Sequence, residues 1–328
     1  MLANLKAKLL GTILCAVIAI VAAIIATRYQ APVMLFALLL GLTAHAFYRK
    51  SNIQQGVNFC SRELLRLCVG LLGVRIAFAD IVSLGITPPL IVMTSMALTI
   101  IFGVLFSRVL GLPKTFGVLS GGAVAVCGVS AAAAISTVLP KDKSQEKYFA
   151  LTVIGITTFS TLSMIFYPIL TSYLGFSDEL AGVFIGGAIH DVAQVVGAGY
   201  TISPEAGDVA TYIKLLRVAL LMPIVMMVFF AFKERDSKMS GGVSAFIPGF
   251  LILFFVLAFL KNIGVMPAWL IEVIRSLSSN LLVVAIAAIG VKTSLKQVVS
   301  VGWRPVLLMG SETVFLASLI IGSILFFY

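Results

Sequence analysis

The chain has 328 residues, of which 60% are hydrophobic and 11% are charged. A soluble domain of this length needs far more charge on its surface, so the composition excludes one. The net charge of +10 is accounted for by Lys and Arg in cytoplasmic loops, where they orient membrane helices, and we expect no nucleic-acid partner. The composition therefore predicts an all-α polytopic membrane protein, with a single transmembrane domain over residues 1–328.

Hydropathy predicts about eleven transmembrane helices, because each spanning helix needs about 20 apolar residues. They cover residues 9–27, 32–48, 61–78, 88–107, 115–138, 148–170, 180–200, 209–232, 244–260, 268–291 and 305–327. The first resembles a signal peptide, but its long apolar run without a clear cleavage site favours an uncleaved helix. With a cytoplasmic N-terminus, thirteen Lys and Arg residues in or near loops lie inside and six outside, which supports that orientation.

The chain contains only two histidines, His45 and His190, and each closes a short apolar stretch that contains glycine. About a helix later come two similar runs, Glu63-Leu-Leu-Arg66 after the first and Lys214-Leu-Leu-Arg217 after the second. Equivalent helices are then five apart and run in opposite directions, which predicts an inverted repeat. In membrane proteins this duplication is typical of transporters with a central site.

The predicted 5+5 inverted repeat divides the chain into residues 32–170 and residues 180–327, with residues 9–27 as an extra N-terminal helix. A rival alignment matches Gly73 and its neighbours with Gly290 and its neighbours. That alignment cannot form complete halves, so we interpret it as two similar connectors at helix ends.

The predicted helix at 115–138 is rich in small residues, because twelve of the seventeen residues from Ser120 to Ser136 are Gly, Ala or Ser. Such residues allow close helix packing, but several glycines also weaken a helix. A break near Cys127–Ser130 would direct the N-terminus of a half-helix at a bound anion. We expect its partner in the second half to be the helix at 268–291, whose apolar run is interrupted at Ser276, Ser278, Ser279 and Asn280.

The predicted helix at 180–200 carries the densest polar cluster, which consists of His190, Asp191 and Gln194. On a helix, His190 and Gln194 share a face and Asp191 also reaches Gln194. Such residues inside a membrane face a cavity or a partner, and a histidine can carry a coupled proton. The alternative is a hydrogen-bond network between helices; for His45, which lacks polar neighbours, we favour the structural role.

Lys214 and Arg217 lie three residues apart on one face of the next predicted helix and are candidates for binding an anionic group. The alternative is that their side chains snorkel to the membrane interface. Glu312, two turns into the last helix, has no obvious partner and no assigned role. The four cysteines form no C-x-x-C pair, so we expect no metal site and no cofactor.

Residues 121–134, Gly-Gly-Ala-Val-Ala-Val-Cys-Gly-Val-Ser-Ala-Ala-Ala-Ala, resemble the small-residue motif of the YeiH-type sulfate exporter family. Residues 186–199, Gly-Gly-Ala-Ile-His-Asp-Val-Ala-Gln-Val-Val-Gly-Ala-Gly, resemble its H-D-x-A-Q-V-V motif. The resemblance covers nearly the whole chain and implies a multi-pass transporter of the bacterial inner membrane. It also implies an architecture like that of sodium/proton antiporters and bile-acid symporters, with crossed discontinuous helices at 115–138 and 268–291. Val129 departs from the family pattern, in which Gly or Asn is commoner.

The predicted function is secondary active transport, as an exporter, of a small anion such as sulfate, a sulfonate or a carboxylate, by alternating access. The alternatives are a cation/proton antiporter on the same fold and an anion channel; an enzyme is not expected, since catalytic motifs are missing. Expected partners are the lipid bilayer, the anion and a coupling proton or sodium ion, with a homodimer left open. The candidate substrate-binding residues are Gly122, Cys127, Gly128, Ser130, His190, Asp191, Gln194, Lys214, Arg217, Ser279 and Asn280.

Overall fold

The computed structural model describes residues 2–29, 33–48, 51–76, 79, 85–140, 145–232, 249–292 and 303–328. Within these ranges every regular element is a helix, which confirms the predicted all-α class. Six of the described helices are long and apolar enough to cross a membrane. They cover Lys8–Arg28, Thr87–Val109, Lys147–Tyr173, Pro204–Phe232, Ala268–Lys292 and Trp303–Phe327. The chain is thus a polytopic membrane protein, while the count of eleven spans stays a prediction.

Most of the described helices match the predicted spans in sequence, although several spans consist of two or three shorter elements. The helix at Ser51–Phe59 was not predicted, because it lies in the expected loop between the spans at 32–48 and 61–78. Residues 244–248, at the start of one predicted span, lie outside the described residues. The same holds for the loops at 233–238 and 293–302, on which much of the predicted orientation depends. The cytoplasmic position of the N-terminus therefore also stays a prediction.

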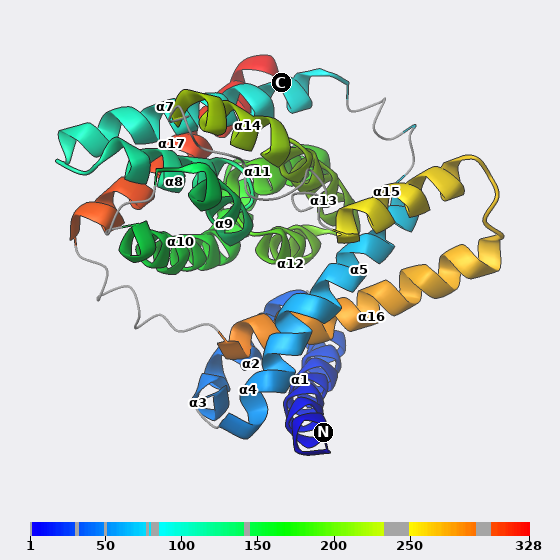
Figure 1. The fold of residues 1–328 in the computed structure, drawn as a ribbon. Coiled ribbons are helices and arrows are strands. Elements are labelled where there is room, and N and C mark those ends of the chain that lie inside the picture. The colour runs from blue at the N-terminus through cyan, green and yellow to red at the C-terminus, as the bar shows by residue number, and fades with distance from the viewer. Residues whose placement is uncertain are drawn as a thin grey trace. The chain divides into compact units, whose positions relative to one another are not determined.

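Contacts divide the chain into two compact units, and the first consists of Met1–Ser83, Val196–Asp208 and Gly249–Ser294. Neither unit coincides with a predicted repeat, because each draws on both halves of the sequence. The first unit consists of the following described helices, of which Figure 1 labels those named α. They are α1 (Leu2–Tyr29), α2 (Val33–Thr43), α3 (His45–Tyr48), α4 (Ser51–Phe59), the π-helix η1 (Cys60–Leu64), α5 (Leu65–Leu71), the 3-10 helix η2 (Leu72–Arg75), α15 (Gly249–Asn262) and α16 (Ala268–Lys292).

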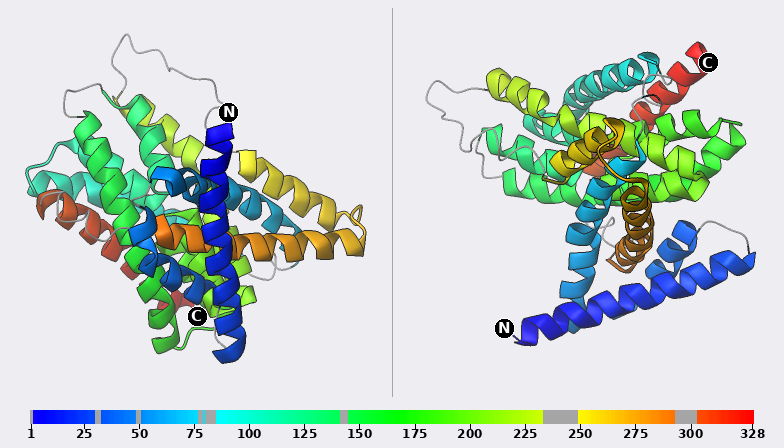
Figure 2. Two further views of the ribbon diagram at one scale, coloured as in Figure 1. Left: turned by 90° about the horizontal axis from the view of Figure 1, so that it is seen from below. Right: turned by 90° about the vertical axis from the view of Figure 1, so that its right-hand side faces the viewer.

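Glycine contacts hold the first unit together, since α2 packs on α16 and α1 packs on α4. A Cβ atom on Gly41 of α2 would lie 2.9 Å from the Cα of Gly290 in α16. Gly11 of α1 meets Gly56 of α4 in the same way, at 2.7 Å. Figure 2 shows α1 as one continuous helix. Beside the α2–α16 contact, Nδ1 of His45 lies 2.9 Å from the carbonyl oxygen of Val291, which fits the structural role favoured for this histidine.

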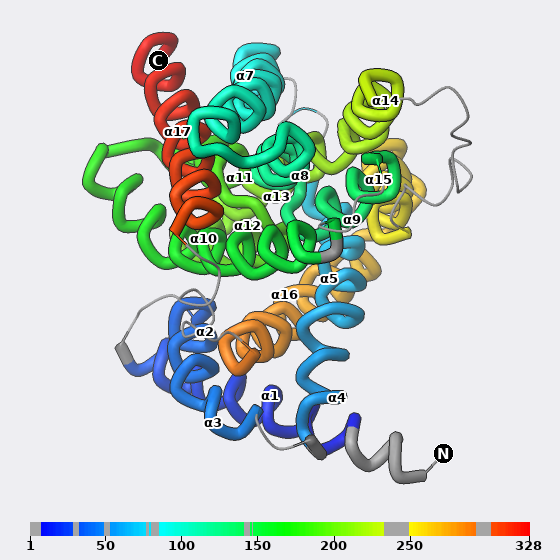
Figure 3. The backbone as a smooth tube through the Cα atoms, turned by 60° about the vertical axis from the view of Figure 1, so that its left-hand side comes forward, coloured from blue at the N-terminus to red at the C-terminus, as the bar shows by residue number. Residues whose placement is uncertain are grey.

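The second unit consists of Leu84–Val195, Val209–Pro248 and Leu295–Tyr328. In it α7 packs along α8 and α17, as Figure 3 shows. Gly103 of α7 and Gly117 of α8 allow this approach, because a Cβ atom on Gly103 would lie 2.8 Å from the carbonyl oxygen of Gly117. Its helices are α7 (Thr87–Val109), α8 (Lys114–Ala125), α9 (Val129–Val138), α10 (Gln145–Tyr173), α11 (Asp178–Ala188), α14 (Leu221–Phe232) and α17 (Trp303–Phe327), and it shares α12 (Val192–Ile202) and α13 (Pro204–Ala219) with the first unit.

Two helices of the described chain are interrupted by three residues, one of them as predicted. The span at 115–138 breaks between α8 and α9, at Val126, Cys127 and Gly128. The span at 180–200, which we predicted as one helix, breaks between α11 and α12 at residues 189–191. Sequence reasoning missed this second break.

The predicted interruption of the helix at 268–291 is wrong, because α16 is continuous from Ala268 to Lys292. The hydroxyl groups of Ser278 and Ser279 both donate to the carbonyl oxygen of Arg275, at 2.9 Å. Serines that bond back to the preceding turn are compatible with an intact helix. The pair of discontinuous helices therefore does not support the predicted inverted repeat, which rests on the matched sequence runs alone and stays a prediction.

The contact between α2 and α16 generates a stability prediction. Gly41→Val should lower the Tm of the purified protein, because the added side chain meets backbone atoms of α16 and overpacking costs about 1–3 kcal/mol. Gly322→Val is the matched control, since nothing lies within 4 Å of a Cβ atom there. Thermal unfolding followed by tryptophan fluorescence measures both variants, and equal Tm values for the two would contradict the packing described.

Candidate substrate site at two helix breaks

The first break places the N-terminus of α9 beside a glycine with a positive φ angle. Gly128 has φ 68° and ψ −125°, a conformation that side chains strongly disfavour. It is the N-cap residue of α9 and, as a glycine, supplies no side-chain cap. The first N–H groups of a helix lack partners within the helix, so those of Val129 and Ser130 are the ones that α9 offers to a ligand.

The predicted site residues of this segment lie in or next to the break. Cys127 and Gly128 are buried within it, while Ser130 is exposed in the first turn of α9. Gly122 has a packing role instead, because a Cβ atom there would collide with the side chain of Ile135 in α9. The N-terminus of α9 is therefore exposed at Ser130. The two halves of the broken helix, α8 and α9, pack closely against each other at Gly122.

The second break is capped by the chain itself. Asp191 is at the start of α12, where its Oδ1 accepts a hydrogen bond from the backbone N–H of Ala193 at 2.7 Å. Its own N–H donates to the hydroxyl of Ser160 at 3.1 Å. A carboxylate at a helix N-terminus satisfies free N–H groups and offsets the partial positive charge there. The N-terminus of α12 is therefore capped by a carboxylate of the chain, whereas the N-cap residue of α9 is a glycine.

The predicted helix face shared by His190 and Gln194 is wrong, because the break separates His190 from α12. His190 lies between α11 and α12 and does not share a helix face with Gln194. The amide of Gln194 donates to the hydroxyl of Thr161 in α10 at 2.8 Å, and Asp191 caps α12 three residues before Gln194. The alternative of a hydrogen-bond network between helices fits Gln194.

The side chain of Arg217, on α13, joins the two broken helices. It is completely buried, and its Nε and Nη atoms donate six hydrogen bonds of 2.5–3.0 Å to five backbone carbonyl oxygens. These belong to the end of α8 and to the end of α11 with the residue after it. The acceptors are Val124, Ala125, Gly186, Gly187 and Ile189.

Lys214 lies one turn before Arg217 and makes the same kind of contact. Its Nζ donates to the carbonyl oxygen of Val126 at 2.7 Å and to that of Ile189 at 2.9 Å, and it is completely buried. Because neither cation is exposed, the snorkelling alternative is wrong for both. The last carbonyl groups of a helix lack partners within the helix and carry partial negative charge, which buried cations can neutralise.

Further polar contacts connect α17 to the second break and to α8. Nε2 of His190 lies 2.9 Å from the hydroxyl oxygen of Thr313, which itself donates to the carbonyl oxygen of Met309. The neighbouring residue, Glu312, accepts a hydrogen bond of 2.8 Å from the hydroxyl of Ser120 in α8. Residues from α8, α17 and the second break thus meet in the core of this unit.

The two remaining predicted site residues, Ser279 and Asn280, belong to the first unit. Ser279 accepts a hydrogen bond of 2.5 Å from Nη2 of Arg75, and Asn280 is exposed. Arg75 also lies 3.7 Å from Oδ1 of Asp208 and over the ring of Tyr200, whose hydroxyl donates to the same carboxylate. Sequence reasoning did not identify this cluster, because its members come from three separate stretches of the chain.

One repeated run could have revealed the second break. Gly121-Gly-Ala-Val124 comes shortly before the first break, and Gly186-Gly-Ala-Ile189 leads into the second. α8 ends at Ala125 and α11 ends at Ala188, so similar sequences precede both interruptions. The second run resembles the first more closely than it resembles the serine-rich segment of α16.

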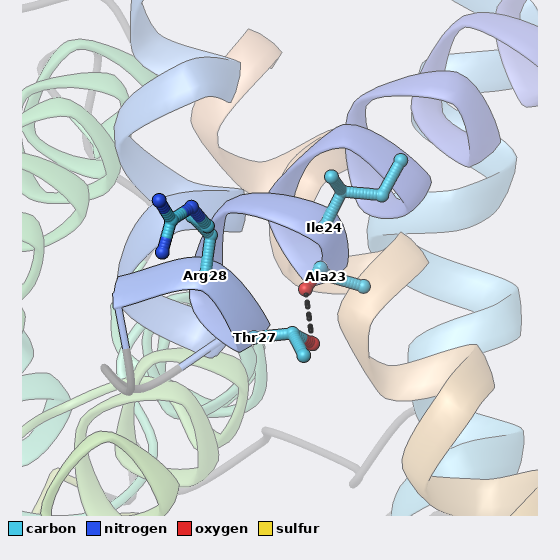
Figure 4. Close-up of a pocket in the computed structure, with 4 residues that line it drawn as sticks. All are labelled: Ala23, Ile24, Thr27 and Arg28. Carbon is cyan, nitrogen blue, oxygen red and sulfur yellow. Dashed lines mark hydrogen bonds between the residues drawn. The ribbon is translucent and has the colours of Figure 1, made fainter.

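A hollow on α1 is a separate feature of the first unit. Its described lining consists of Ala23, Ile24, Thr27 and Arg28, all in consecutive turns of one helix, as Figure 4 shows. The drawn hydrogen bond joins the Thr27 hydroxyl to the carbonyl oxygen of Ala23, at 2.9 Å within the helix. Since these polar contacts are internal to α1, we do not regard the hollow as a substrate site.

Comparison with known proteins identifies the family. The family model described as "Conserved hypothetical protein 698" matches residues 9–309. A UPF0324 membrane protein of Chlorobaculum tepidum is 45% identical, over 96% of this chain and 88% of its own length. The UPF0324 membrane protein TauZ of Paracoccus denitrificans is 43% identical, over 95% and 94%. These matches confirm the family expected from the H-D-x-A-Q-V-V and small-residue motifs, and the chain belongs to the UPF0324 family of membrane proteins.

Proposed function

We propose that this protein is a secondary active transporter, not an enzyme, and that it exports a small anion such as sulfate, a sulfonate or a carboxylate. The anion binds at the uncapped N-terminus of α9 and crosses the inner membrane by alternating access. The observation that carries this proposal is the meeting of four helix ends around Lys214 and Arg217, with one N-terminus left without a side-chain cap.

A count of charge at this meeting point favours an anion. Each helix terminus contributes about half an elementary charge, so the two C-termini and the two N-termini cancel. Lys214 and Arg217 add two positive charges, and Asp191 removes one by capping α12. With Glu312 in its neutral acid form, about one positive charge remains in a medium where uncompensated charge is costly. A bound anion would neutralise it.

The chemistry of the α9 terminus suits an oxyanion. Backbone N–H groups at a helix start converge on a single point and bind sulfate, phosphate or carboxylate without a basic side chain. The exposed hydroxyl of Ser130 supplies a further donor beside them. This assignment keeps Gly128 and Ser130 as binding residues, and gives Lys214 and Arg217 the task of neutralising the C-termini of α8 and α11.

The cation/proton antiporter is disfavoured by the same count, because a cation would add to the surplus of positive charge. Asp191, the carboxylate at the described breaks, is engaged with the N-terminus of α12. An anion channel differs from a carrier only in its kinetics, so transport measurements must separate the two.

Transport into proteoliposomes tests the function directly. Vesicles that contain the purified protein should take up radiolabelled sulfate, methanesulfonate or succinate, and uptake should accelerate when the same unlabelled anion is preloaded inside. This acceleration identifies a carrier, because a channel gains no turnover from a loaded opposite side. Uptake of radioactive sodium without uptake of any of the three anions would contradict the proposal.

Ser130 allows the anion site to be tested without loss of folding. Ser130→Asp should abolish anion uptake, because a carboxylate in the first turn of α9 occupies the positive end of the helix. The same charge is expected to stabilise the helix by about 0.3–1 kcal/mol, so the Tm should not fall. Ser130→Asn, which is similar in size but neutral, is the control and should retain uptake. Equal transport by both variants would refute this position of the site.

Arg217 should be essential for folding rather than for substrate affinity. Arg217→Met removes the side-chain donors of four carbonyl groups, since that of Ile189 keeps Lys214, and each buried unsatisfied carbonyl costs about 1–3 kcal/mol. We expect little monodisperse protein in size-exclusion chromatography. Arg66→Met, at a side chain that is 56% exposed, is the control and should behave like the wild type. A well-folded Arg217→Met variant that lacks only transport would contradict this division of roles.

A further inference from the structure

Glu312 is a buried carboxyl group whose two oxygen atoms have different surroundings. It lies in α17 and is completely buried. Oε1 accepts the hydrogen bond from the Ser120 hydroxyl, whereas Oε2 is buried without a hydrogen-bond partner among the described residues. An ionised carboxylate in the core of a membrane protein is costly unless a cation or several donors compensate it.

The space around this carboxyl group depends on a glycine of another helix. A Cβ atom on Gly103 of α7 would lie 2.5 Å from Oε1 of Glu312, so a larger residue there would displace the carboxyl group. Residues of α7 and α8 thus leave room for the side chain that enters from α17. The unpartnered Oε2 is the atom on which a proton can reside.

The charged and titratable groups on the helices packed against α17 lie mostly at helix ends. Among the described ion pairs, none involves Glu312, so no cation lies within 4.0 Å of its oxygen atoms in this part of the chain. The buried titratable side chain nearest in the hydrogen-bond pattern is His190, which contacts the adjacent Thr313. The groups on these elements are Arg108 of α7, Lys114 of α8, Lys147, Tyr148, Tyr167 and Tyr173 of α10, Asp178 and Glu179 of α11, and Arg304 of α17 itself.

His190 is poorly placed to take up a proton. The hydroxyl of Thr313 donates to the carbonyl oxygen of Met309, which leaves its oxygen to accept from Nε2 of His190 in the neutral tautomer with Nε2–H. A proton added at Nδ1 would create a third positive charge beside Lys214 and Arg217. The proton-coupling role that we considered for this histidine therefore suits a titratable group without neighbouring cations better.

Building on the proposed transport function, we propose that Glu312 is the proton-binding group of the transport cycle. Its carboxylate takes up one proton at Oε2 to become a neutral carboxylic acid and later releases the same proton. Its position suits this role, because Ser120 belongs to the broken helix α8 and Thr313 holds His190 in the second break. A change of charge at Glu312 thus acts on Ser120 of the broken helix α8 and, next to Thr313, on the contact that holds His190 in the second break.

The proton site is tested first by infrared difference spectroscopy of the reconstituted protein, which needs no substrate. The wild type should show a carboxylic-acid C=O band that titrates with pH and is missing in Glu312→Gln. Glu63→Gln is the control, since Glu63 is exposed and pairs with Arg66, and the band should remain. Ser120→Ala should shift the band without removing it, because it deletes the hydrogen bond to Oε1.

Transport then tests the coupling. A pH gradient should drive sulfate, methanesulfonate or succinate uptake by the wild type and by Glu63→Gln. In Glu312→Gln the rate of this gradient-driven uptake should fall at least tenfold. Exchange of labelled for unlabelled anion should be retained. Gradient-driven uptake by Glu312→Gln at the wild-type rate would overturn the proposal, as would a band unchanged by this substitution or missing from the wild type. If no anion is transported, the anion proposal fails, while the infrared band still decides whether Glu312 binds a proton.

Discussion

The contact on which this architecture depends is the one between two buried cations and the carbonyl ends of two broken helices. A helix that stops inside a membrane leaves its last carbonyl groups without partners, and lipid cannot supply them. Arg217 and Lys214 supply donors to α8 and α11 together, with eight hydrogen bonds of 2.5–3.0 Å. The two breaks therefore depend on each other, because the same two cations donate hydrogen bonds to the carbonyl ends at both.

The two breaks differ in the N-cap residue of the helix that follows, and this difference determines where an anion can bind. At α12 the chain supplies its own carboxylate, Asp191, whereas at α9 the equivalent N-cap position is Gly128. A side chain at Gly128 would strain the backbone and reduce access to the N–H groups of α9. The positive end of α9 is thus the N-terminus at the breaks that carries no carboxylate at its N-cap, which is why we assign the anion to it.

Sequence patterns predicted the helices well, because apolar runs and membrane thickness constrain them strongly; α7 and α10 lie where hydropathy placed them. The break at Gly128 was also predictable from three glycines in one helix. The break at His190 was not, because its cause is tertiary: Arg217 binds carbonyl groups 28 to 93 residues away. The serines of α16 indicated a break falsely, since bonds within the helix satisfy them. Glu312 had no assignment because its partner, Ser120, is 192 residues distant.

The central claim is that a small oxyanion binds at the start of α9, within reach of the N–H groups of Val129 and Ser130. An experimental structure with selenate, whose selenium scatters anomalously, tests it most directly. We predict an anomalous peak at this helix terminus, within hydrogen-bond distance of those N–H groups and of the Ser130 hydroxyl. A well-ordered break with no peak there, and selenate bound elsewhere in the protein, would contradict the account.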